Sequence, residues 1–220
     1  MIFSGSSAAN RVGPMEDLQS LFKDIQRSQR DGDHNKVIAL CSEGLKHLLL
    51  VPVGTRAHKS IAALYTTRGM MYGLIRDYKH ALADLNDALS ISPGAASIFR
   101  ERGMIFSAMG DIQHAIDDLT SSINLRPDYA NSYLYRAKLK LQQGDPSAAE
   151  EDLNRCLELN PSCVDAYILR GDTRKSRSAL IDAISDYERA YELSGDIKLI
   201  LKSESIRAPR VRNSGSSETR

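Results

Sequence analysis

Arginine and aspartate recur along this chain at one fixed spacing. Each of four arginines is followed 16 residues later by an aspartate, and successive pairs lie 34 residues apart. The pairs are Arg68 with Asp84, Arg102 with Asp118, Arg136 with Asp152, and Arg170 with Asp186. Guanidinium groups bind phosphates and carboxylates, so these arginines could hold an anionic ligand. The alternative is a series of structural ion pairs inside the protein, because a buried arginine without a partner is costly.

The histidines and cysteines lack the spacing of a reactive centre. None of the five histidines forms a metal-type pair with a cysteine or another histidine. Cys41 and Cys156 fall at small or apolar positions, and Cys163 falls in a turn beside Pro161. The sequence contains no phosphate-binding loop, nucleophile elbow or dinucleotide fingerprint. We therefore expect a protein that is not an enzyme and that holds no cofactor and no metal.

Small residues follow the same period and indicate which elements carry the charges. They fill three places in each copy: Gly69, Gly103, Ala137 and Gly171; Ala81, Ala115, Ala149 and Ala183; and Ala88, Ser122, Cys156 and Ala190. An aromatic residue stands near the start of each copy: Tyr65, Phe99, Tyr133 and Tyr167. Gly110-Asp111 and Gly144-Asp145 are typical of a turn in which glycine ends one helix and aspartate caps the next. Each copy is therefore predicted to be a pair of closely packed helices.

Taken together, these features resemble the tetratricopeptide repeat family, in which each repeat is a 34-residue helix pair. The resemblance rests on the small residues, the aromatic residues and the period. It implies an all-α fold, a right-handed α-solenoid of antiparallel helix pairs. Stacking such pairs creates an extended concave surface that can bind a partner.

The predicted organisation places four clear repeats in the middle of the chain. Upstream, residues 33–45 align with residues 77–89, which predicts a divergent first pair and then a helix from Thr55 to about Arg76. In chain order we expect a disordered segment at 1–14, a divergent pair with an insertion at 15–61, repeats at 62–95, 96–129, 130–163 and 164–197, a capping helix at 198–206, and a disordered basic tail at 207–220. The apolar residues of the capping helix are predicted to pack inward: Ile200, Leu201 and Ile206.

The resemblance also implies a binding groove. In this family the concave face comes from a few positions of each first helix. Carried over to this sequence, the groove residues are Thr66, Met70, Leu74, Ser97, Arg100, Met104, Asn131, Leu134, Lys138, Gln142, Asp165, Asp172 and Lys175. The early part of this set is small and apolar, with adaptable methionines, and the later part is polar and partly basic. An extended or helical peptide with an apolar part and an acidic part would fit it.

The leading hypothesis is a protein-interaction module, a scaffold or adaptor that binds a segment of another protein. One alternative is a co-chaperone adaptor, since some family members bind acidic chaperone tails with lysine, asparagine and arginine. Here Glu101 or Asp165 stands where those residues are needed, so recruitment would lack the usual clamp. A second alternative is RNA binding along the basic part of the groove, which the scarcity of aromatic residues there disfavours.

Charge and composition are consistent with an interaction module. The 220 residues carry a net charge of +1, which argues against a dedicated nucleic-acid binder. Residues 62–197 are acidic overall and the last part of the chain is basic. The most apolar run, at residues 48–51, is far below the roughly 20 residues needed to cross a bilayer. Three cysteines, an odd number, are typical of a reducing compartment, so we expect a cytoplasmic protein, or a nuclear one.

Overall fold

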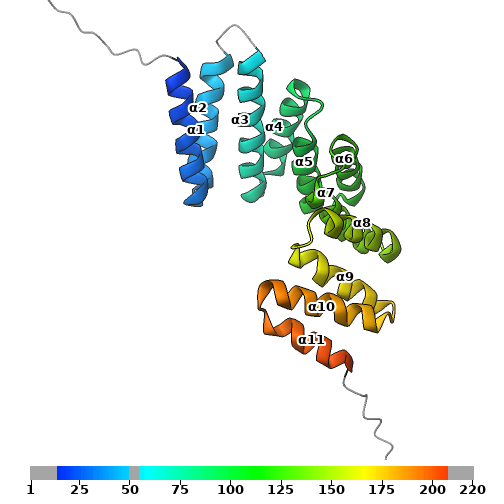
Figure 1. The fold of residues 1–220 in the computed structure, drawn as a ribbon. Coiled ribbons are helices and arrows are strands. Elements are labelled where there is room, and N and C mark those ends of the chain that lie inside the picture. Colours follow the sequence, from blue (N-terminus) through cyan, green and yellow to red (C-terminus); the bar gives the residue numbers. More distant parts are fainter. Residues whose placement is uncertain (1–13, 50–54, 208–220) are drawn as a thin grey trace, which may run out of the picture. The chain divides into compact units, whose positions relative to one another are not determined.

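The computed structural model describes residues 14–49 and 55–207, whose regular secondary structure is entirely α-helical (Figure 1). The helices are α1 (Pro14–Arg30), α2 (His34–Leu49), α3 (Thr55–Leu74), α4 (Tyr78–Ile91), α5 (Ala96–Met109), α6 (Ile112–Leu125), α7 (Ala130–Gln142), α8 (Pro146–Leu159), α9 (Val164–Ser176), α10 (Leu180–Ser194) and α11 (Ile197–Arg207). Most of the predicted disordered segments, and residues 50–54 of the predicted insertion, lie outside the described residues. Pro14 and Arg207, which were predicted to be disordered, belong instead to α1 and α11.

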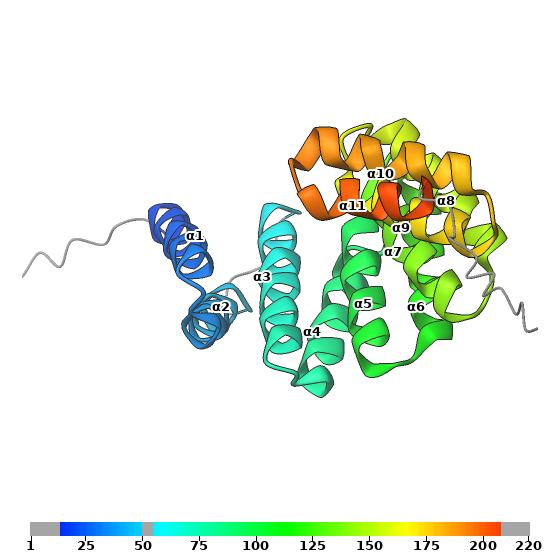
Figure 2. The ribbon, with the colours of Figure 1, turned by 90° about the horizontal axis from the view of Figure 1, so that it is seen from below.

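The chain divides into two compact units, each of which is described by itself. Unit 1 is Met1–Asp111 and contains α1 to α5, whereas unit 2 is Ile112–Arg220 and contains α6 to α11. Within each unit, every helix packs against the next one along the chain (Figures 1 and 2). In unit 1, α3 also contacts α5, which is the next first helix. The predicted all-α fold of consecutively packed helix pairs is confirmed.

The turn inside each clear repeat has a left-handed residue, whether or not that residue is glycine. Gly110 and Gly144 have φ values of 83° and 82°, as the sequence predicts. Arg76 and Ser178 occupy the equivalent places with φ values of 63° and 65°. Because a side chain makes this conformation costly, the helix pair must impose it on these two residues. This turn also ends α3 at Leu74, two residues before the predicted end.

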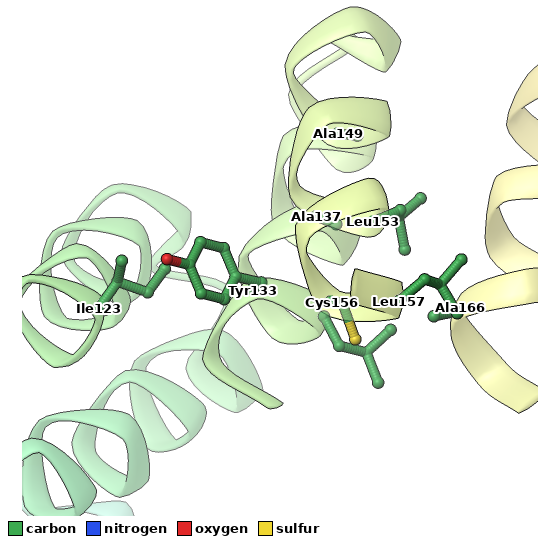
Figure 3. Close-up of a cluster of buried hydrophobic side chains, with 9 residues drawn as sticks. Ile123, Tyr133, Ala137, Ala149, Leu153, Cys156, Leu157 and Ala166 are labelled. Atoms are coloured by element: carbon green, nitrogen blue, oxygen red, sulfur yellow. The ribbon is translucent and has the colours of Figure 1, made fainter. Parts of the chain in front are cut away.

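Small residues form the core of each repeat. Ala81 and Ala88 in unit 1, and Ala149, Cys156 and Ala183 in unit 2, have no exposed surface. Figure 3 shows the largest such cluster in unit 2, where α6, α7, α8 and α9 meet around Leu153. These small residues lie on second helices, and Ala137 on the first helix α7 is equally buried. Burial of small residues on both helices of a pair fixes the register at which the charged residues face each other.

The capping helix α11 packs through a face that includes only part of the predicted one, since Ile200 and Ile206 are partly buried but Leu201 is not. Leu199 and Ser203 are buried against α10, and Ile206 is partly buried there. Leu201 was predicted to pack inward but is 57% exposed. The residues that share the buried face are three or four apart, and Leu201 lies two residues from both Leu199 and Ser203, which turns it away from α10.

Candidate functional site

Three of the predicted arginine–aspartate pairs lie wholly within one unit, and all three have the same geometry. In each, Nε and Nη2 of the arginine donate to the aspartate carboxylate. The Nη2–Oδ1 distances are 2.7 Å for Arg68–Asp84, 2.8 Å for Arg136–Asp152 and 2.6 Å for Arg170–Asp186. The aspartates are at most 5% exposed. The hydrogen bond to Asp84 also raises the pKa of Arg68, so this guanidinium stays charged.

The fourth predicted pair, Arg102 with Asp118, would join residues of different units and stays a prediction. Within unit 1, Arg102 donates through Nη1 to Oδ1 of Asn86 at 2.6 Å. Its guanidinium also lies 5.6 Å from the centre of the Phe99 ring. Two of the contacts that surround the other arginines are therefore present at Arg102.

Each arginine also bonds to the helix pair that precedes it. Nη1 donates to a polar side chain on the preceding second helix: Ser42 for Arg68 (2.9 Å), Asn86 for Arg102 (2.6 Å), Thr120 for Arg136 (3.1 Å) and Asn154 for Arg170 (2.7 Å). The guanidinium lies 5.5 to 5.8 Å from the aromatic ring three residues earlier. Sequence reasoning missed these acceptors, although Asn86, Thr120 and Asn154 recur at the repeat period.

These contacts favour the structural interpretation of the arginines over ligand binding. Where an arginine–aspartate pair lies within one unit, the arginine Nε and Nη2 donate to the aspartate and Nη1 donates to the preceding helix pair. An aromatic ring covers one face of the guanidinium. A phosphate or carboxylate ligand would have to displace one of these partners. The arginines therefore link successive helix pairs, and their guanidinium groups are already occupied.

A second cation reaches the buried aspartate in unit 2. Nζ of Lys140 lies 2.9 Å from Asp152, and Nη1 of Arg174 lies 2.9 Å from Asp186. Lys140 and Arg174 each lie four residues after the arginine of their pair. In unit 1 the residue four places after Arg68 is Tyr72, which is uncharged at neutral pH. The buried charges of unit 2 are therefore held by a larger network than the Arg68–Asp84 pair.

The predicted groove residues of unit 1 lie on α3 and α5. Leu74 is 60% exposed, and Thr66, Met70 and Met104 are half-buried. Gly73 brings the two helices close together, because a Cβ there would collide with Cδ1 of Ile105. The remaining two residues of the set are Ser97, which is exposed, and Arg100, which pairs with Glu101. We call the six predicted groove residues of unit 1 the α3–α5 face: Thr66, Met70, Leu74, Ser97, Arg100 and Met104.

The predicted groove residues of unit 2 form a more polar set on α7 and α9. Leu134 is a correction: it is only 6% exposed, because it packs into the core cluster of unit 2 instead of facing solvent. Asn131, Gln142 and Lys175 are exposed, as predicted for a groove.

The other charged members of the unit 2 set already have partners. Lys138 Nζ lies 3.8 Å from Asp165, and it also lies 5.6 Å from the Tyr135 ring. Asp172 accepts hydrogen bonds from Tyr187 at 2.6 Å and from Lys202 at 2.8 Å. Much of the charge on this surface is therefore satisfied within the unit.

The first helices of the two units also end differently. In unit 1, Leu74 ends α3 and Ile75 follows it, and Met109, which is 48% exposed, ends α5. In unit 2 the equivalent places hold Gln142-Gln143 and Ser176-Arg177. Exposed apolar side chains that gather on neighbouring helices are typical of protein-binding surfaces. The sequence carries this difference, because the residues at these places are apolar in unit 1 and polar in unit 2.

The part of the chain that the structure describes offers neither a membrane span nor a metal cluster. No helix among these residues is long and apolar enough to cross a bilayer. Nor do the same residues include three or more histidines, cysteines or carboxylates grouped as metal ligands would be.

Comparison with known proteins matches this architecture. Residues 62–94 match the tetratricopeptide repeat, and residues 79–174 match the second ARM domain of tetratricopeptide repeat protein 21. A tetratricopeptide repeat protein from Parabacteroides merdae has a similar structure, with a TM-score of 0.68 and 18% identity, over 87% of this chain and 72% of that one. MamA has a TM-score of 0.64 and 19% identity, over 79% of this chain and 96% of its own.

YrrB, a tetratricopeptide repeat protein with an unusual peptide-binding site, has a TM-score of 0.61 and 17% identity, over 87% of this chain and 94% of its own. At these identities the likeness shows the fold alone. No curated protein matches the sequence significantly. The sequence matches, the shared fold and the repeated helix pairs lead to one conclusion: this chain belongs to the tetratricopeptide repeat family.

Proposed function

We propose that the chain is a non-enzymatic protein-interaction module, a scaffold or adaptor, and that its α3–α5 face binds an apolar segment of another protein. The observation that supports this most directly is the character of the face itself. Met70 and Met104 are half-buried on neighbouring helices, and exposed Leu74 extends the apolar surface. Methionine side chains are flexible and polarisable, so they adapt to partners of different shape.

The remaining groove residues support an apolar preference over an acidic one. Arg100 and Lys138 were expected to attract an acidic peptide or RNA. Instead, Arg100 pairs with Glu101, and Lys138 lies near Asp165. An acidic ligand would have to compete with these carboxylates. Both the co-chaperone alternative and the RNA alternative depend on such cations. Lys175 is exposed, but the pairing of Arg100 and Lys138 supports an apolar partner segment over either alternative.

A charge-insertion experiment tests the proposal. The double variant Met70→Glu/Met104→Glu places two carboxylates on the α3–α5 face. The matched control Leu125→Glu/Ile181→Glu makes the same charge change at exposed apolar positions of unit 2. We expect proteins captured by the native chain and by the control to be lost from the double variant. A photo-crosslinker at Ser97 should then label a segment of one captured protein. An unchanged set of captured proteins for all three chains would contradict the proposal.

A further inference from the structure

Two cysteines meet where α8 passes into α9. Cys156 lies near the end of α8, is fully buried, and belongs to the core cluster of unit 2 (Figure 3). Cys163 is the residue that immediately precedes α9, is half-buried, and packs against the same cluster. Both cysteines are in the thiol form. The pair therefore combines one thiol that solvent can reach with one that it cannot.

The two thiols lie close to each other. Cys163 packs against the core cluster to which Cys156 belongs, and the two thiols interact electrostatically. Burial, more than this interaction, raises the pKa of Cys156 to about 12. Cys156 therefore stays protonated near neutral pH, and it is too buried to meet an oxidant directly. Cys163, at the surface, is the residue that an oxidant reaches first.

We propose that Cys163 and Cys156 form an oxidisable dithiol site, which peroxides convert into an intramolecular disulfide. In the first step the Cys163 sulfur attacks the peroxide O–O bond. The sulfur becomes a sulfenic acid, and the peroxide is reduced to water or an alcohol. In the second step the Cys156 sulfur attacks the sulfenic sulfur, the S–S bond forms, and the hydroxyl leaves with the Cys156 proton as water. A small thiol reductant reverses the reaction by exchange.

The position of the site gives the disulfide a structural consequence. Cys156 lies in α8, the second helix of the third clear repeat, and Cys163 immediately precedes α9, the first helix of the fourth. The bond would link these helices covalently across the turn at residues 160–162. Cys41 provides the contrast, because it is buried in unit 1 and lies beside the Arg68–Asp84 pair with no cysteine next to it.

Mass spectrometry of the whole chain tests the site. The protein is treated with a small excess of hydrogen peroxide, its remaining thiols are alkylated, and it is digested with trypsin. Both cysteines fall in one tryptic peptide, residues 156–170, because the nearest cleavage sites follow Arg155 and Arg170. We expect this peptide to appear about 2 Da lighter than the reduced form and without alkylation. Dithiothreitol should return it to the doubly alkylated form.

Single substitutions distinguish this pathway from general oxidation. In Cys156→Ser, Cys163 should stop at sulfenic acid, which dimedone traps, and then advance to sulfinic acid. In Cys163→Ser, the buried Cys156 should stay reduced over the same exposure. The control Cys41→Ser should form the disulfide as the native chain does. A native peptide 156–170 that stays doubly alkylated, or one that carries sulfinic acid without a disulfide, would overturn the proposal.

Discussion

Unit 1 and unit 2 contain the same arginine–aspartate geometry but surround it differently. In unit 1, Asp84 accepts hydrogen bonds from Arg68, the one cation against it among the described residues. In unit 2, Lys140 joins Arg136 at Asp152, and Arg174 plays the same part at Asp186. The repeat period therefore fixes the pair itself, whereas one nearby residue decides how many charges share the buried carboxylate.

The two units also differ in the side chains that they expose at the surface. Unit 1 exposes apolar side chains where its first helices end, and unit 2 has polar residues at the equivalent places. Some polar side chains of unit 2 are paired within the unit, for example Asp172 with Tyr187 and Lys202. One repeat sequence has thus produced first helices that end in exposed apolar side chains in unit 1 and in polar side chains in unit 2.

The largest expected difference between the units lies in the loss of a pairing arginine. Arg68→Ala strands the buried Asp84 and should lower the free energy of unfolding by about 3–5 kcal/mol. Arg136→Ala leaves Asp152 with Lys140 and should cost only about 1–2 kcal/mol. Urea denaturation followed by circular dichroism measures both losses. Arg155→Ala, which removes an exposed arginine, should leave the midpoint unchanged. Equal losses for Arg68→Ala and Arg136→Ala would remove the energetic basis of the comparison.

A smaller effect tests whether Lys140 is the cause of that difference. Lys140→Tyr gives unit 2 the residue that follows the arginine in unit 1. In combination with Arg136→Ala it should behave like Arg68→Ala, so the two substitutions together should cost about 2 kcal/mol more than the sum of the single losses. A double-mutant cycle in urea measures this coupling. Strict additivity would show that Lys140 does not stabilise Asp152.

Tyr187 provides a third, weaker difference between the units. It is fully buried where unit 1 has Leu85, and its hydroxyl donates to Asp172 at 2.6 Å. Burial and this hydrogen bond raise its pKa, so the phenol stays neutral. Tyr187→Phe should lower the free energy of unfolding by about 1–2 kcal/mol. Tyr191→Phe is the control, because among the described residues its hydroxyl makes no hydrogen bond. Equal stability of both variants would contradict the importance of the Asp172 contact.

The sequence predicts the features that depend on the 34-residue period, and it misses those that depend on which side chains pack together in the folded chain. Helix pairs and glycine turns follow from residues that recur, as Gly110 and Gly144 do. The left-handed turns at Arg76 and Ser178 do not follow, because neither residue prefers that conformation. Leu134 was placed on the groove because family positions were carried over as a set, although its helix is buried at that point. The second cation at Asp152 depends on packing between α7 and α8, which no spacing rule specifies.

The smallest difference concerns the aspartates that cap α4 and α8. Asp77 accepts from the backbone N–H of His80 at 3.3 Å, and its other oxygen lies 2.7 Å from the His80 ring. The side chain of Asp145 accepts from the backbone N–H of Ala148 at 2.9 Å, and this alanine stands at the place that His80 occupies in unit 1. The hydrogen bond with the His80 side chain, and then that with its backbone, hold the pKa of Asp77 below its ordinary value of 3.8.

A folded-state pKa that is lowered in this way contributes stability above pH 3.8, and the contribution is lost as the pH falls through the lower value. NMR titration of the Asp77 carboxyl should therefore show a pKa below 3.8 in the native chain. His80→Ala should return it toward that value, because it removes the side-chain bond and keeps the backbone one. His58→Ala, which removes another exposed histidine of unit 1, should leave the titration unchanged. If both histidine variants titrate like the native chain, the ring contact does not hold the carboxylate, and the caps of the two units are equivalent.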